Sequence, residues 1–379
     1  MKLMKLNNFH IVILSSIKWD FLWQRHQIIA EYFSTKTDVT FVETTGLRNP
    51  GLSKSIERLT RVLVSKKQIQ RKTPIKNLKI LPPFILPPTH SLFRQFNKNV
   101  FVPKLAKNIR QHSTKPILLI TYVPTSTSLY LIDELKPEKT IYDCVLNFEN
   151  FPGIPKDIVI TENELIQMAD MLIVDSVHLK EKHRHKKEQI TQIPAAVNFE
   201  MFYEIYEQQI MRKKVNKVTY FGGIDHYRID WSIIEQLLEK GIYVELIGPA
   251  PEGIPLRHNH LIHQDTVSHQ SLPSVLKNCD TLILPYQIND FTKGTFPAKL
   301  FECFATGKPI VATALPDLVL FKDVMEIGES KEDFTEKVLV SLQNDNFQKR
   351  EERILLAKDN SWSARCNSYE EVLEGLILN

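Results

Sequence analysis

The alternation of apolar and polar stretches along the chain predicts an α/β protein. Short apolar runs of the kind that form buried parallel strands recur along the sequence, and most of them are followed by a polar loop and a helical pattern. The clearest of these runs are residues 9–15, 39–43, 115–121, 140–142, 171–174, 217–221, 243–247, 281–284 and 309–313. The length of 379 residues and the hydrophobic content of 43% are sufficient for two domains of similar size. We therefore expect two lobes, each built on a parallel sheet.

The stretch 285–316 is the strongest candidate for chemistry. Between the expected strands 281–284 and 309–313 the pattern predicts one helix over about 297–306, because Pro297 suits a first helical position and Gly307 suits a left-handed stop. The loop ahead of this helix is longer than the roughly 2–6 residues usual in such units. A long loop at the carboxyl end of a strand, leading into a helix, is where open α/β sheets bind ligands.

The start of this predicted helix points to an anionic ligand. Its cap would be Phe296, whose side chain cannot accept a hydrogen bond from the first-turn amides. Lys299 and Glu302 would share one face with Cys303 and Thr306. The alternative is an ordinary surface with a solvated Lys299–Glu302 ion pair. However, a lysine in the first turn opposes the helix dipole, and lysine before glutamate is the poorer order for such a pair. A bound phosphate would remove the first objection.

The same segment resembles a known family. The run T-F-P-A-K-L-F-E-C-F-A-T-G-K-P-I-V-A-T is similar to the nucleotide-sugar segment of retaining glycosyltransferases with the GT-B fold, family 4, in which a glutamate and an A-x-G-K-P run grip the donor's ribose. Glu302 and residues 305–309 match that pattern. Where the family often has another glutamate eight residues earlier, this chain has Gly294. In having P-x-K-L-x-E without that glutamate, the chain most resembles the branch that makes teichuronic acids and related envelope polysaccharides.

The resemblance implies a fold, domain limits and a donor site. The fold would be α/β of the GT-B type, with two Rossmann-like lobes facing a cleft. Residues 1–205 would form the acceptor lobe and 206–361 the nucleotide-sugar lobe, and 362–379 would form a C-terminal helix crossing back to the first. Arg228, Lys299 and Glu302 would act in catalysis, with Arg228 pairing with phosphate. The donor would also touch Gly222, Gly223, Gly248, Pro249, Thr295, Phe296 and Pro297.

Two motifs in the first lobe are candidates for the acceptor side. The run W-D-F-L-W-Q-R-H-Q, which includes Trp19 and Arg25, resembles the opening of the same branch, where the first loop faces the cleft. Asp143 lies in a Y-D-C-V run that also matches, although the acids expected next are Leu146 and Asn147 here. The alternatives are an ordinary core or surface position for Trp19, and a local turn cap for Asp143.

Charge and cysteine usage add a membrane hypothesis and exclude some metal sites. Residues 51–79 contain nine lysines and arginines and one acid, Glu57, so this segment is either a solvated loop or a surface for anionic lipid. In the second case the neighbouring Pro-rich path 81–88 would enter the membrane interface with it. The four cysteines have no metal-finger spacing, there is no D-x-D, and His183 and His185 would diverge on a helix. No apolar run approaches the ~20 residues of a membrane span. We expect no metal, no cofactor, and a cytoplasmic protein at the inner face of the membrane.

The combined reading is a retaining, metal-independent glycosyltransferase. It would move a sugar from a nucleoside diphosphate sugar to a saccharide acceptor, lipid-linked in our expectation, in envelope or exopolysaccharide biosynthesis, with no nucleic-acid partner. The alternatives are a non-catalytic two-lobed sugar- or nucleotide-binding protein and a sugar-nucleotide epimerase of the same fold. An NAD-dependent enzyme is disfavoured because no strand leads into G-x-G-x-x-G. The sequence leaves open the sugar, the base and the acceptor.

Overall fold

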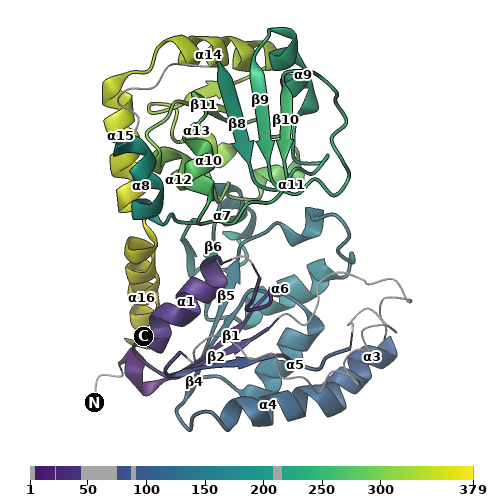
Figure 1. Ribbon diagram of the computed structural model, residues 1–379. Helices are drawn as coiled ribbons and strands as arrows, with labels where there is room; N and C mark the ends of the chain where they lie inside the picture. Colours follow the sequence, from purple (N-terminus) through teal and green to yellow (C-terminus); the bar gives the residue numbers. More distant parts are fainter. Residues whose placement is uncertain (1–4, 22, 44–74, 87–90, 208–215, 379) are drawn as a thin grey trace. The chain divides into compact units, whose positions relative to one another are not determined.

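The chain forms two α/β units, each with one parallel sheet (Figure 1). The computed structural model describes residues 5–21, 23–43, 75–86, 91–207 and 216–378. The first unit comprises Met1–Asp175, Leu179–Ile193 and Cys366–Asn379, and the second comprises Ser176–His178 and Pro194–Arg365. The predicted fold class is thereby confirmed. Most of the basic segment 51–79 lies outside the described residues.

The first unit has seven parallel strands in the order β3-β2-β1-β4-β5-β6-β7. Its central strands are apolar on both faces, since helices cover both. The strands are β1 (His10–Leu14), β2 (Val39–Val42), β3 (Leu78–Leu81), β4 (Ile117–Thr121), β5 (Lys139–Cys144), β6 (Met171–Val174) and β7 (Ile190–Gln192). The helices are α1 (Arg25–Ser34), α3 (Ser91–Phe96), the π-helix η2 (Asn97–Phe101), α4 (Val102–Arg110), α5 (Ser126–Leu135), α6 (Ile158–Met168) and α7 (Val177–His183).

Alternate residues of the central strands feed two separate apolar clusters in this unit. Val12 packs in a cluster with residues of α4, α5 and α6, whereas Ile13 packs in one with α1 and the C-terminal helix α16 (Trp362–Leu378). Figure 1 shows α16 beside α1, and Tyr32 of α1 donates a hydrogen bond to Glu370 of α16. From Cys366 onward the last helix thus belongs to the first unit.

The second unit has six parallel strands in the order β10-β9-β8-β11-β12-β13. They are β8 (Lys217–Phe221), β9 (Tyr243–Ile247), β10 (Leu261–Gln264), β11 (Thr281–Leu284), β12 (Ile310–Thr313) and β13 (Glu326–Gly328). The helices are α8 (Phe199–Glu207), α9 (Trp231–Glu239), α10 (Leu272–Leu276), α11 (Asp290–Lys293), α12 (Leu300–Ala305), α13 (Pro316–Val319), α14 (Lys331–Gln343) and α15 (Phe347–Asp359).

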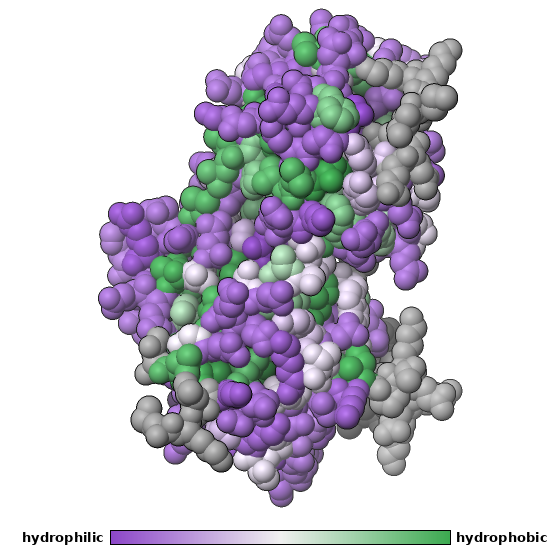
Figure 2. Space-filling view, turned by 90° about the vertical axis from the view of Figure 1, so that its left-hand side faces the viewer, coloured by the Kyte–Doolittle hydropathy of each residue, from purple (hydrophilic) through white to green (hydrophobic). Residues whose placement is uncertain are grey.

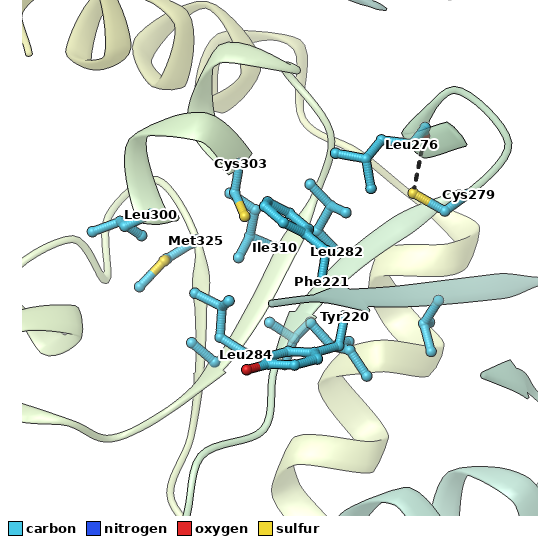
Figure 3. Close-up of a cluster of buried hydrophobic side chains, with 14 of the residues drawn as sticks. Tyr220, Phe221, Leu276, Cys279, Leu282, Leu284, Leu300, Cys303, Ile310 and Met325 are labelled. Carbon is cyan, nitrogen blue, oxygen red and sulfur yellow. Dashed lines mark hydrogen bonds between the residues drawn. The ribbon is translucent and has the colours of Figure 1, made fainter. Parts of the chain in front are cut away.

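The core of the second unit lies between the sheet and its helices. Leu300 and Cys303 of α12 belong to the same cluster as Leu282 and Ile310 of β11 and β12, and Figure 3 shows Cys303 beside Ile310 and Tyr220 of β8 beside Leu284. All of these side chains are buried. Outside the cores, hydrophilic residues dominate the surface on the side shown in Figure 2, with smaller hydrophobic areas between them. The strand order places β8 and β11 together at the centre, so their carboxyl-end loops adjoin.

The predicted helix 297–306 is shorter than expected. It begins at Leu300 instead of Pro297, and Lys299 is its capping residue and not a member of its first turn. The amide of Leu300 donates to the carbonyl of Pro297 at 2.9 Å, which is the tighter spacing of a turn. The loop before it also contains α11, whose start is capped by the Asn289 side chain. The predicted cap at Phe296 is therefore wrong, whereas the expectation that no side chain caps the start of this helix holds, since Lys299 makes no capping hydrogen bond.

Candidate functional site

The loops after β8 and β9 approach each other through two glycines. Gly222 has φ +124° and Gly248 has φ +140°, values that favour glycine. A Cβ at residue 248 would lie 2.1 Å from the carbonyl oxygen of Gly222, too close for any other residue. The amide of Gly222 donates to the carbonyl of Ile247 at 2.8 Å. The turn at 222–223 is therefore fixed in place by backbone contacts, as a site for close approach of a ligand requires.

Lys299 reaches across this turn from the start of α12. Its Nζ donates to the Tyr220 hydroxyl at 2.9 Å, and that hydroxyl donates to the carbonyl of Gly223 at 2.9 Å. The ammonium also lies 4.1 Å from the centroid of the Tyr220 ring, within cation–π range. A Cβ at Gly222 would lie 2.3 Å from Nζ. The structure thus brings Lys299 and Gly222 together, although they are far apart in the sequence.

Arg228 adjoins the same turn from the other side. Its carbonyl accepts from the Gln287 amide at 2.8 Å, so the loops after β8 and β11 are joined at this residue. A Cβ at Gly223 would lie 3.0 Å from Arg228 Nη1. The Arg228 Nη2 lies 3.5 Å from Asp225 Oδ2, and its side chain is 27% exposed. Two cationic side chains therefore border a glycine turn, an arrangement that can bind an anion with several oxygens, such as a diphosphate.

Glu302 has a partner that the sequence did not indicate. Its Oε1 lies 2.8 Å from His269 Nε2, and the His269 ring packs near Phe202 with centroids 5.6 Å apart. Glu302 therefore pairs with His269, and Lys299 with Tyr220, so the solvated Lys299–Glu302 pair considered above does not describe the contacts found. Because His269 lies on the segment before α10, no periodicity or spacing could have assigned it to Glu302.

The pairing of His269 with Glu302 should make stability depend on pH. The hydrogen bond to Glu302, opposed by burial, raises the pKa of His269 above its usual 6.5. A raised folded-state pKa favours the protonated form, so the pair stabilises the fold below pH 6.5. That contribution is lost as the pH rises through the raised pKa. The Tm deficit of a His269→Gln variant should accordingly be larger at about pH 6 than at about pH 9.

Thermal melts of both proteins across this range test the expectation. His185→Gln, at an exposed histidine of the first unit, is the control and should show no such trend. A deficit of the same size at every pH would mean that the charge of His269 does not contribute.

Three residues of the loop before α12 were predicted to touch the donor, and the structure places them mainly inside the protein. Phe296 and Pro297 are buried, and the Phe296 ring stacks on Phe301 with centroids 5.6 Å apart. The Thr295 hydroxyl donates to the Phe291 carbonyl at 3.1 Å. The contacts of Thr295 and Phe296 therefore shape the loop, and Lys299 at the end of the loop carries its positive charge.

The A-T-G-K-P run after Glu302 is mainly structural. Lys308 is buried, and its Nζ donates to the carbonyl of Cys279 at 2.7 Å. The Thr306 hydroxyl accepts from the Lys308 amide at 3.1 Å. Gly307 has φ +66°, and a Cβ there would lie 2.6 Å from the Tyr206 ring. The run therefore ends α12 and joins it to β12, which leaves Glu302 as the residue of the motif best placed for a ligand.

The loop after β9, which includes Gly248 and Pro249, is tied to the same turn. The Pro249 carbonyl accepts from the Ile224 amide at 3.0 Å, and the Gly248 carbonyl lies 2.9 Å from His263 Nε2. Both predicted donor-binding residues therefore adjoin Gly222 and Gly223 through backbone contacts.

The predicted acceptor residues Arg25 and Asp143 form a buried ion pair. Arg25 Nε and Nη2 donate to the two Asp143 carboxylate oxygens at 2.9 and 3.0 Å, and the Tyr369 hydroxyl donates to Asp143 at 3.1 Å. Asp143 is fully buried and Arg25 is 7% exposed. The pair joins α1, β5 and α16 inside the first unit, so we correct the expectation that these two residues contact an acceptor. Their geometry is bidentate, as buried arginine–carboxylate pairs require.

Trp19 is also an interior residue. It is 8% exposed and packs edge-to-face on Phe41 with centroids 5.0 Å apart, and its amide donates to Glu43 Oε1. This is the core position that was the alternative for Trp19, and it corrects the expected acceptor role.

One buried group of metal-ligand types occurs within the described part of the chain. It consists of Cys144, Glu162 and His183, whose ligand atoms lie within 4.8 Å of one another. The Tyr142 hydroxyl donates to Glu162 Oε1 at 2.7 Å. Burial raises the pKa of the Cys144 thiol and of the Glu162 carboxyl, which favours their neutral forms. The group fits a neutral hydrogen-bonded cluster, and the absence of a metal stays a prediction.

Comparisons with known proteins place this geometry in context. No protein-family model matches the chain. Over 217 residues it is 28% identical to TuaH of Bacillus subtilis (strain 168), which has the provisional name of a teichuronic acid biosynthesis glycosyltransferase. The match covers 51% of this chain and 53% of TuaH, about half the length of this curated relative.

Solved structures match over nearly the whole chain. Sucrose-phosphate synthase from Thermosynechococcus elongatus has a TM-score of 0.69 at 13% identity, covering 97% of this chain and 99% of its own. Anabaena HepE, solved in complex with UDP-glucose, has a TM-score of 0.66 at 11% identity, covering 97% and 99%. Identities this low show a shared fold, and the resemblance to the GT-B architecture is confirmed.

Proposed function

Because the chain has the GT-B fold, we propose that it is a glycosyltransferase of polysaccharide biosynthesis that uses a nucleoside diphosphate sugar. The observation that carries this proposal is the convergence of Lys299 and Arg228 on the Gly222–Gly223 turn. The relative TuaH, named for teichuronic acid biosynthesis, supports the polysaccharide context. HepE, solved with UDP-glucose, supports the donor class.

In the proposed reaction the bond between the anomeric carbon and the diphosphate oxygen breaks, and the acceptor oxygen takes the sugar. Negative charge on the leaving diphosphate grows as this bond breaks. Lys299 and Arg228 would stabilise that charge, and their effect is large because both side chains are already held in place by the surrounding loops. Glu302, held through one oxygen by His269, would accept hydrogen bonds from the ribose hydroxyls with the other.

The finer features of the proposal come from the resemblance. The sugar would keep its anomeric configuration, the leaving phosphate would take the acceptor's proton, and the acceptor would be lipid-linked. No metal ion would be needed, since two cationic side chains stand at the leaving group. The competing function is binding without catalysis, which the same donor site would also support.

Donor binding and metal dependence test this function together. In a thermal-shift panel of UDP-, GDP- and dTDP-sugars, at least one should raise the Tm, because a ligand at 100 times its Kd stabilises the native state by about 2.7 kcal/mol. Donor hydrolysis or transfer should then persist in EDTA.

Three outcomes would change the proposal. Stabilisation by none of the nucleotides would remove the donor site. Binding without any hydrolysis or transfer, tested with lipid-linked and free saccharide acceptors, would favour the binding protein. Activity lost in EDTA and restored by a divalent ion would contradict the metal-free reaction.

A further inference from the structure

A continuous helical segment of the first unit exposes an apolar stripe. The elements α3, η2 and α4 follow one another from Ser91 to Arg110 without a break. Leu92, Phe96 and Val100, spaced four residues apart, are 65%, 56% and 50% exposed. Residues at this spacing share one face of a helix. The next positions on that face, Lys104 and Lys107, are also exposed. This set of five residues is called the outer stripe below.

The side of this helical segment opposite the outer stripe is held by contacts within the unit. On the inner side, Asn97 is fully buried, and its side chain exchanges two hydrogen bonds with the Leu86 backbone, at 2.9 and 2.8 Å. Further along, Leu105 and Ile109 pack into the apolar cluster on that face of the sheet. Exposure of the stripe is therefore built into the fold, because the opposite side of the helix is anchored.

The charge around the outer stripe has one sign. Residues 91–110 contain five lysines and arginines and no acid, and no aspartate or glutamate occurs anywhere between residues 58 and 132. Three of the five basic side chains have partners in the unit: Arg94 pairs with Asp157, the residue before α6, Lys98 lies over the Tyr130 ring, and Arg110 donates to the Leu135 carbonyl. Lys104 and Lys107 lie on the exposed side. A protein partner would have to be acidic along this whole length, whereas an anionic bilayer offers that charge and an apolar interior at once.

We propose that the outer stripe is a docking surface for an anionic lipid bilayer. Leu92, Phe96 and Val100 would enter the boundary between headgroups and acyl chains, with Lys104 and Lys107 against the lipid phosphates. The helix would lie in the plane of the interface. None of the described helices is long and apolar enough to span a membrane. The inference does not rest on the proposed function, because lipid binding can be measured without any sugar.

Vesicle co-sedimentation of the full chain tests this surface. The protein should bind vesicles that contain phosphatidylglycerol more tightly than pure phosphatidylcholine, and high salt should release it. The variant L92S/F96S/V100S should bind the anionic vesicles about tenfold or more weakly, since it loses the apolar insertion. The variant K104E/K107E should lose most of the preference for anionic lipid.

A matched control separates this surface from general hydrophobicity. Val340, Phe347 and Leu355 of the second unit are 54%, 69% and 59% exposed, so V340S/F347S/L355S removes a comparable amount of exposed apolar surface elsewhere. Its vesicle binding should equal that of the unaltered protein. Thermal melts of all variants check that each is folded.

Four results would overturn the proposal. The protein could fail to bind vesicles, or bind neutral and anionic ones equally. The L92S/F96S/V100S variant could bind as tightly as the unaltered protein, which would place the lipid contact elsewhere, such as residues 51–79. A dimer that this variant dissociates, without lipid binding, would make the stripe an interface between two copies of the chain.

Discussion

Replacing Lys299 with alanine is expected to slow sugar transfer by roughly ten- to a thousandfold. The ammonium stands at the Gly222–Gly223 turn, where the leaving diphosphate would lie, and removing one charge-stabilising group costs about 1.4–4 kcal/mol of transition-state stabilisation. The loss should fall mainly on kcat, because the charge on the diphosphate grows as the bond breaks. Arg228→Ala should act in the same direction. The measurement is release of nucleoside diphosphate with the donor identified by thermal shift.

Lys293 provides the matched control for this prediction. It is a partly exposed lysine of α11, in the same loop, and its Nζ lies 3.8 Å from Asp290 Oδ1. Lys293→Ala should transfer sugar at the rate of the unaltered protein. Native rates in both Lys299→Ala and Arg228→Ala would place the phosphate site elsewhere in the chain.

Replacing Glu302 with alanine is expected to weaken donor binding by roughly ten- to a hundredfold. The Glu302 oxygen that His269 leaves open can accept from a ribose hydroxyl, and losing one hydrogen bond to a charged group costs about 1.5–3 kcal/mol, which is roughly ten- to a hundredfold in affinity. The fold should survive, since the Glu302 side chain is partly exposed, at 17%, and its hydrogen-bond partner His269 is 43% exposed. Isothermal titration with the donor, or with the nucleoside diphosphate alone, measures the effect.

The His269→Gln variant tests the role of the Glu302 oxygen that His269 contacts separately from the role of the other oxygen. Glutamine can still donate to the oxygen that His269 holds, so the donor affinity should fall less than in Glu302→Ala. Unchanged affinity in Glu302→Ala would remove this residue from the nucleotide site while leaving the Lys299 prediction intact.

The strands of both sheets could be predicted because their pattern is local. Runs such as residues 117–121 and 281–284 are mostly apolar and buried throughout, as is typical of parallel strands covered on both faces, and each is followed by a turn and a helix. The resemblance also pointed to the glycines at 222 and 248 as ligand contacts. The sequence did not explain why residue 248 must be glycine. The structure does, because the carbonyl oxygen of Gly222 occupies the space that a Cβ at residue 248 would need.

The sequence by itself determined the α/β class, the two-lobed GT-B architecture and the segment that contains Lys299 and Glu302. These follow from periodicity and from a motif, both of which are read over a few neighbouring residues. The tertiary structure alone decided which side chains meet. It paired Glu302 with His269, turned Lys308 inward onto the Cys279 carbonyl, and buried Arg25 against Asp143. Partners 33, 29 and 118 residues apart are chosen by packing of the whole unit, and no local pattern encodes that choice.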